Sequence, residues 1–167
     1  MTSHHLQLML ICLKILTMIR YLILFIFAYN ITFAQTQSDA ILGTWLSEAK
    51  DLKVEIYKQK NQFFGKLIWF HCPVNTPPME HYKDKENPNV SLRNRPWLGA
   101  ILLKDLVFSG TNEWENGAIY DPNSGSTYRS KVKLLDPQTL HVRGYVGIPL
   151  LGKTMVFNRE KVLSLQK

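Results

Sequence analysis

The feature of this chain that most restricts its fold is a series of short β-forming runs after residue 40. In these runs, branched aliphatic and aromatic residues alternate with polar ones, and turn-forming residues separate the runs at short intervals. The runs cover residues 41–46, 52–57, 63–70, 100–108, 113–120, 126–135, 140–146 and 153–159. About eight strands joined mostly by hairpin-length links avoid exposed edges best by closing. We therefore predict an all-β, antiparallel up-and-down barrel.

The hairpin near residue 137 predicts a strand register. Pairing Leu134 with Leu140 and Val132 with Val142 keeps the apolar residues of both strands on one face, because residues directly opposite in a ladder share a face. A slip of one residue would turn one apolar set outward. This register makes the connecting loop odd in length and centres it on Pro137.

The same register predicts a basic stripe across the two strands. It brings basic and polar residues opposite one another in three pairs: Lys133 with His141, Lys131 with Arg143, and Arg129 with Tyr145. Like charges in directly opposed positions are destabilising, so an anionic partner would offset them. The stripe either covers the outer face of the barrel or, if it points inward, lines an anion-binding pocket.

One long interruption separates the third and fourth runs. Residues 71–98 hold five prolines and a charged stretch at 81–88. A connection of this length without regular structure is unusual in a compact domain and is usually functional or mobile. We predict that it forms a lid or flap over one end of the barrel.

The N-terminal part resembles an export signal. An apolar run at 21–28 follows Arg20, and small residues occupy positions minus three and minus one before residue 35. The apolar run is about as long as a signal-peptide core and shorter than the roughly 18 residues that cross a bilayer. We predict a signal peptide over residues 1–34, cleaved after Ala34, and a single β-barrel domain over 35–167.

A shorter signal is also encoded. Met18 stands two residues before Arg20, so translation from Met18 would produce a complete signal peptide without the first 17 residues. The alternative to cleavage is an uncleaved N-terminal anchor. With cleavage, the protein is expected to be exported to the periplasm or secreted, without a stable membrane span.

Cysteine usage and charge limit the partners. Residues 35–167 contain one cysteine, Cys72, so no internal disulfide can form there. The net charge is +7, and removing Lys14 and Arg20 with the signal leaves +5. This balance favours an anionic ligand, an envelope protein or an anionic surface, or it serves solubility alone. Nucleic acid is not an expected partner outside the cytoplasm.

A short signature points to a known barrel family. Gly43 and Trp45 in the first run, together with Arg159 in the last, resemble the lipocalin and wider calycin signature. In that family the tryptophan closes one end of the barrel and the late arginine packs across it. The resemblance implies the same structural role for these three residues.

Further motifs resemble a more specific family. They follow one another along the chain at residues 65–69, 87–88, 92–96, 117–128 and 143–147. Together they resemble a widespread family of secreted bacterial proteins with a conserved domain of unknown function. The resemblance implies a small lipocalin-like barrel in the periplasm or beyond. It implies no established activity and no catalytic residues.

The long connection contains a charged cluster at 84–89 and 93–95. Its carboxylate and amide oxygens suit calcium, but the glycine and the closing glutamate of an EF-hand loop are missing. A turn braced by Arg–carboxylate pairs is the favoured interpretation. Alternatively, Arg93 and Arg95 could contact a ligand carboxylate or phosphate.

Two other groups of residues are candidates for a metal site and a catalytic site. His71, Cys72 and His81 have the ligand types of zinc but match no standard spacing, so we predict no metal and no cofactor. Glu113 and Glu115 lie on one strand face, roughly 7 Å apart, a separation compatible with paired-carboxylate glycoside hydrolysis. A solvated strand end is the favoured interpretation, and no catalytic residue is predicted.

These observations favour binding over catalysis. The leading hypothesis is a lipocalin-like protein that binds a small amphipathic or acidic ligand. The alternative is an envelope interaction module with a filled barrel and a basic docking face, and a hydrolase is the weakest hypothesis. The predicted ligand-binding residues are Arg93, Arg95, Trp97, Tyr128, Arg143 and Tyr145.

Overall fold

The computed structural model describes residues 9, 13–22 and 37–160 of the chain. Residues 13–22 are helical, and a separate compact unit begins at Ser38. Most of the predicted signal peptide, including its cleavage point after Ala34, lies outside the described residues. Over the described residues, no helix combines the length and apolar character that crossing a bilayer requires.

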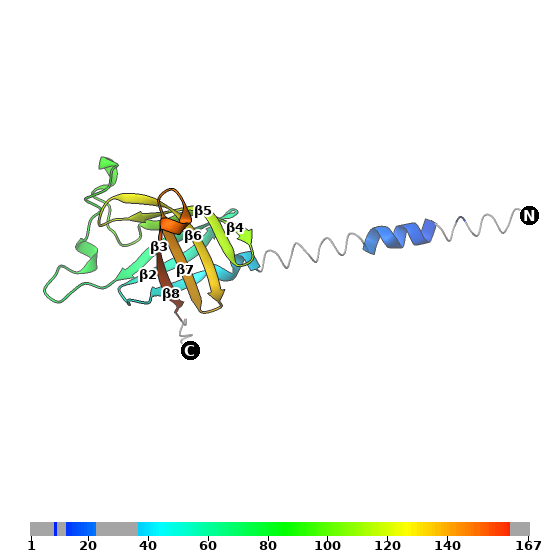
Figure 1. Ribbon diagram of the computed structural model, residues 1–167, viewed down its shortest axis with the longest axis horizontal. Coiled ribbons are helices and arrows are strands. Elements are labelled where there is room, and N and C mark those ends of the chain that lie inside the picture. The colour runs from blue at the N-terminus through cyan, green and yellow to red at the C-terminus, as the bar shows by residue number, and fades with distance from the viewer. Residues whose placement is uncertain (1–8, 10–12, 23–36, 161–167) are drawn as a thin grey trace, which may run out of the picture. The chain divides into compact units, whose positions relative to one another are not determined.

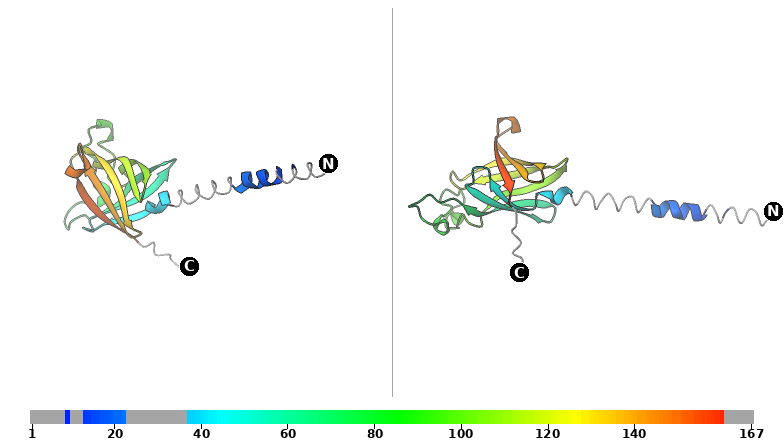
Figure 2. Two further views of the ribbon diagram at one scale, coloured as in Figure 1. Left: turned by 45° about the vertical axis from the view of Figure 1, so that its right-hand side comes forward. Right: turned by 90° about the horizontal axis from the view of Figure 1, so that it is seen from below.

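The described part of the second unit forms a closed, antiparallel, eight-stranded barrel in which each strand pairs with the next and β8 pairs back to β1 (Figures 1 and 2). The strands are β1 (Gly43–Ser47), β2 (Leu52–Gln59), β3 (Gln62–Phe70), β4 (Ile101–Gly110), β5 (Glu113–Asp121), β6 (Ser126–Asp136), β7 (Thr139–Tyr145) and β8 (Lys153–Arg159). Short 3-10 turns are η1 (Asp39–Ile41), η2 (Met79–His81), η3 (Val90–Leu92) and η4 (Pro149–Leu151). The predicted fold class is confirmed.

The predicted register between β6 and β7 is also confirmed, with one refinement. Leu134 pairs with Leu140 and Val132 with Val142. The pairing then shifts, so that Asp136 lies opposite Thr139 and the ladder is irregular at residue 135. The turn therefore contains only two residues, at 137 and 138, instead of an evenly spaced odd-length loop.

Burial decides which face of β6 and β7 points inward. Val132, Leu140 and Val142 are each 1% exposed, and Leu134 is 7% exposed. Side chains alternate between the two faces of a strand, so the lysines and arginines of the basic stripe lie on the outer surface and not in the interior.

The end of the barrel where β1 begins is closed by aromatic rings. Trp45 and Trp114 are fully buried, and Phe63 packs edge-on against Trp114 with ring centroids 6.2 Å apart. Each indole donates to a backbone carbonyl in or beside η1: Trp45 to Ile41 at 2.8 Å, and Trp114 to Ser38 at 3.1 Å. These bonds satisfy both buried donors and hold η1 across this end.

Arg159 covers the same end. Its guanidinium lies 4.1 Å from the centre of the Trp45 ring and donates to the carbonyls of Ala40, Leu42 and Pro137 at 2.6–2.7 Å. Gly43 has a φ of +119°, and a Cβ there would lie 3.2 Å from the guanidinium. The signature residues thus form one packed cap, because the arginine ties together chain segments that are far apart in sequence.

Candidate functional site

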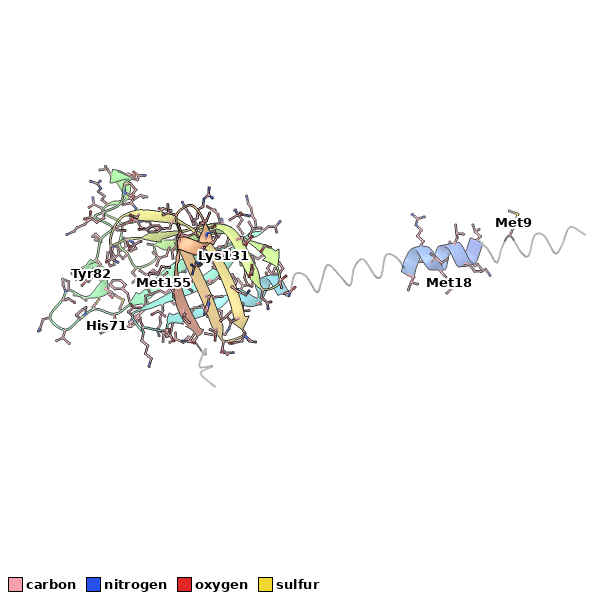
Figure 3. The ribbon with its side chains drawn as sticks, in the orientation of Figure 1. Met9, Met18, His71, Tyr82, Lys131 and Met155 are labelled. Atoms are coloured by element: carbon pink, nitrogen blue, oxygen red, sulfur yellow. The ribbon has the colours of Figure 1, made fainter. Side chains whose placement is uncertain are left out.

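A cavity of about 910 Å³ opens at the opposite end of the barrel from this cap. Inward-facing side chains of β2 to β8 line it, and its wall is mostly apolar. Wall residues include Val54, Leu67, Leu103, Val142, Met155 and Phe157. Figure 3 labels Met155 on β8 and His71 at the end of β3, both of which line the cavity. This end of the barrel is therefore hollow, which does not favour the alternative of a filled barrel.

The rim of the cavity carries the polar groups. Asp51 accepts a hydrogen bond from Ser47 Oγ at 2.6 Å, and Asp121 accepts from the backbone of Asn123 at 3.0 Å, so both carboxylates are held within their own turns. Lys153 also lines the cavity and makes no salt bridge among the described residues. Among the described residues that line this rim, Lys153 is the lysine or arginine whose cationic group can meet an anionic group.

Trp97 contributes an aromatic wall from the long connection. Its ring packs against Phe70 and Tyr82, with centroids 5.5 and 5.3 Å away. The backbone fixes it there, since Trp97 donates to the carbonyl of Tyr82 at 3.0 Å and Gly99 donates to the carbonyl of Leu67 at 2.8 Å. Within the described part of the chain, the buried Nε1 of Trp97 has no hydrogen-bond partner. A buried donor without an acceptor is costly and calls for an explanation.

A buried polar network fastens the long connection to the barrel. Asp84 is fully buried and accepts hydrogen bonds from the Tyr120 hydroxyl on β5, from Asn87 Nδ2 at 2.7 Å and from Arg95 Nε at 2.9 Å. Arg95 also pairs with the same carboxylate through its terminal nitrogen at 2.7 Å. The network agrees with the favoured interpretation of this cluster as a turn braced by an Arg–carboxylate pair. Both Asp84 oxygens thus accept hydrogen bonds from protein groups, and Arg95 balances their charge.

The pKa values in this network follow from burial and hydrogen bonding. Burial alone would raise the pKa of Asp84, but the hydrogen bonds from Tyr120, Asn87 and Arg95 outweigh it and hold the pKa below its usual value. Burial and the adjacent Asp84 carboxylate raise the pKa of Tyr120 to about 12. Tyr120 therefore stays protonated at neutral pH and donates to an ionised Asp84.

A close backbone approach makes a second attachment. Gly125 in the β5–β6 hairpin has a φ of +70°, and a Cβ there would lie 1.9 Å from the carbonyl oxygen of Glu86. Only glycine allows this approach. The hairpin and the network together hold residues 84–87 against the barrel. Of the long connection, His71 and Trp97 line the cavity, so the predicted lid reduces to the two ends of this segment.

The structure separates the six predicted ligand-binding residues into two groups. Trp97, Tyr128 and Tyr145 line the cavity, whereas Arg93, Arg95 and Arg143 are not among its lining residues. The three guanidinium groups are directed to protein acceptors instead: Arg93 to the carbonyl of Asn87, Arg95 to Asp84, and Arg143 to Pro149, Leu150 and Thr154.

Sequence reasoning missed Tyr120 and Lys153, and it did not connect Asp84 of the charged cluster with Tyr120. The available signal for Tyr120 was its place just before the turn that starts at Asp121. Its partner Asp84 lies 36 residues earlier in the chain, and no local pattern connects them. Lys153 was recognised only as the start of a strand.

The carboxylate pair considered for hydrolysis lies away from the cavity. Glu113 pairs with Lys133 across the outer face at 2.8 Å, and this hydrogen bond lowers the pKa of Glu113. Neither Glu113 nor Glu115 lines the cavity. Among the described residues, no group of three His, Cys, Asp or Glu side chains is placed to hold a metal ion.

Comparison with known proteins agrees with this architecture. Residues 43–159 match the model of a bacterial family described as "Uncharacterized protein conserved in bacteria (DUF2147)". The chain belongs to the DUF2147 family. This DUF2147 protein is also similar to a solved structure described as "Protein HP1028 from the human pathogen Helicobacter pylori belongs to the lipocalin family".

The similarity to HP1028 extends over most of both chains. Sequence identity is 26%, the alignment covers 73% of this chain and 84% of HP1028, and the TM-score is 0.63. The predicted resemblance to a bacterial family with a lipocalin-like barrel is therefore confirmed. A comparison with curated proteins gave no match.

Proposed function

We propose that this DUF2147 protein binds a small amphipathic molecule in the cavity opposite the Trp45 cap. The observation that carries the proposal is a cavity of about 910 Å³ with a mainly apolar wall. Ligand pockets in proteins commonly enclose about 300–1,000 Å³ and combine apolar walls with a few polar groups. Similarity to HP1028, a protein of the lipocalin family, supports the same function.

One charged group at the rim defines the ligand further. Lys153 lies at the rim without a salt bridge among the described residues, where it can attract an anionic group. The ligand that fits best has an apolar body and one acidic head.

Two fluorescent probes of nearly equal shape test this proposal. One is N-phenyl-1-naphthylamine, which is neutral, and the other is 1-anilinonaphthalene-8-sulfonate, which adds an anionic acceptor. We expect both probes to fluoresce on binding. Lys153→Gln should weaken binding of the sulfonate by about fivefold and spare the neutral probe, because the variant keeps a polar side chain and loses the charge.

A matched pair of variants on β8 locates the probes. Met155 lines the cavity, whereas its neighbour Val156 points to the other face of the strand. We expect Met155→Trp to block both probes and Val156→Trp to leave them bound, with circular dichroism confirming that both variants fold. Binding that survives Met155→Trp in a folded protein would overturn the proposal. If the probes bind as expected, native mass spectrometry of protein purified from its own host is the experiment that identifies a retained natural ligand.

We also propose that the barrel domain is exported. The apolar run at 21–28 behind Arg20 and the small residues before position 35 support this proposal. Mass spectrometry of the protein from its own host is expected to find Gln35 at the N-terminus. A different N-terminus would contradict cleavage after Ala34.

A further inference from the structure

The loop between β7 and β8 presents four exposed apolar side chains. Val146 is 70% exposed, Ile148 56%, Leu150 81% and Leu151 77%. Figure 2 shows this orange loop, which carries η4, projecting from the body of the barrel. Apolar side chains exposed next to one another, unlike scattered single ones, usually mark an interaction site.

The loop is held in its projecting position. The Arg143 guanidinium donates to the carbonyls of Pro149 and Leu150, at 2.5 and 3.0 Å, and to Thr154 Oγ1 at 2.6 Å. At the base of the loop, a Cβ on Gly152 would lie 2.5 Å from the carbonyl oxygen of Gly144. These contacts hold the backbone of the loop in its projecting conformation. The apolar side chains at its tip therefore stay exposed.

The strands beside the loop are basic. Between residues 126 and 159 the sole acidic residue is Asp136, against six lysines and arginines: Arg129, Lys131, Lys133, Arg143, Lys153 and Arg159. Among the described residues, Arg129, Lys131 and Lys153 take part in no salt bridge. Arg129 lies opposite Tyr145 in the ladder, and Lys153 directly follows the loop. The charge beside the apolar tips therefore selects an anionic partner.

We propose that this loop docks the protein on an anionic lipid bilayer. Leu150 and Leu151 enter the boundary between headgroups and acyl chains, while Arg129 and Lys131 lie over the lipid phosphates. Apolar tips next to lysine and arginine are the arrangement that binds at a membrane interface.

The position of the loop agrees with this partner. Val146 and Leu151 line the mouth of the cavity as well as belonging to the exposed loop. A bilayer contacted by the loop would therefore lie next to the cavity mouth. The docking proposal does not depend on the cavity being filled, so it can fail or succeed independently of the proposed function.

Hydrogen exchange of the full chain on vesicles tests the docking proposal. Amide exchange at residues 146–152 is measured without lipid, with phosphatidylcholine vesicles, and with vesicles that also contain phosphatidylglycerol. Because the readout is local, binding through any other segment of the chain is distinguished from binding through the loop. We expect slower exchange at 146–152 on the anionic vesicles and little change on the neutral ones.

Two double variants with matched controls measure the contributions by vesicle sedimentation. Leu150→Asp with Leu151→Asp should weaken loop-dependent binding by at least about tenfold, because two exposed apolar side chains are lost. Val74→Asp is the control, since Val74 is 89% exposed in a different loop. Arg129→Glu with Lys131→Glu should weaken vesicle binding by more than about twentyfold, since each basic residue near an anionic surface contributes about fivefold. Lys60→Glu, at the opposite end of the barrel, is the charge control and should have little effect.

Three results would overturn the docking proposal. The first is unchanged exchange at 146–152 while the protein sediments with the vesicles. The second is equal protection on neutral and anionic vesicles, which would remove the role of the basic residues. The third is protection of this loop in a complex with another protein but not on vesicles, which would assign it to a protein partner.

Discussion

Replacing Tyr120 with phenylalanine tests whether the Asp84 network stabilises the fold. The hydroxyl donates to the buried Asp84 carboxylate and accepts from Asn87 Nδ2 at 3.2 Å. A hydrogen bond to a charged group contributes about 1.5–3 kcal/mol, and its loss here also leaves the Asn87 amide with one acceptor fewer. We expect Tyr120→Phe to lower the free energy of unfolding by about 2–3 kcal/mol at neutral pH.

The dependence of the free energy of unfolding on alkaline pH provides a second test of the network. The pKa of Tyr120 is raised in the folded protein from 10.0 to about 12. A group whose folded pKa is raised contributes stability that is fully present below its unfolded pKa and is lost as the pH rises through the folded pKa. The wild type should therefore lose up to about 3 kcal/mol between these two pH values on account of Tyr120, and Tyr120→Phe should lack this component.

Urea unfolding followed by tryptophan fluorescence, repeated from neutral pH to about pH 12, measures both effects. Tyr57→Phe is a suitable control, because Tyr57 is stacked on Phe64 and its hydroxyl has no hydrogen bond among the described residues. We expect this control to stay within about 0.5 kcal/mol of the wild type. If Tyr120→Phe is as stable as the control at neutral pH and keeps the wild-type alkaline loss, the assignment of the network is refuted.

Two further substitutions test the attachment of the long connection and the cap. Gly125→Ala places a Cβ 1.9 Å from the Glu86 carbonyl oxygen at a φ of +70°, so thermal unfolding should show a loss of more than about 3 kcal/mol. Gly147→Ala, at a φ of +71° with no atom nearby, should cost only about 1 kcal/mol, and equal losses would contradict the close approach. Arg159→Lys keeps the charge but loses the multiple carbonyl bonds and planar stacking on Trp45, which should cost about 2–4 kcal/mol in calorimetry. An unchanged melting temperature would show that the cap does not depend on the guanidinium.

The strands and one register were predictable because they depend on local alternation. Leu134 and Leu140 must share a face if both are to be buried, and this requirement alone selects their pairing. The irregularity after Leu134 was not predictable in this way. It lies beyond Leu134 and Leu140, the last buried apolar pair of the hairpin, so no further buried side chain indicates the register there.

The candidate site was predictable only in part. Of the residues predicted to bind a ligand, Trp97, Tyr128 and Tyr145 line the cavity. Arginines were expected to contact an anionic ligand, but Arg95 pairs with Asp84 and Arg143 supports the β7–β8 loop. A sequence shows which charged groups are present but not which of them are satisfied by the protein itself.

The amino-acid sequence by itself determined the closed all-β barrel, the pairing of β6 with β7 and the residues of the Trp45–Arg159 cap. The barrel and the pairing follow from short-range periodicity, and the cap residues follow from the resemblance of Gly43, Trp45 and Arg159 to the lipocalin signature. Only the tertiary structure decided that one end of the barrel is hollow, that Asp84 is buried against Tyr120, and that the basic stripe lies outside. The physical reason is that cavity volume and the satisfaction of buried polar groups depend on side chains from many strands at once. No single segment of the chain contains that information.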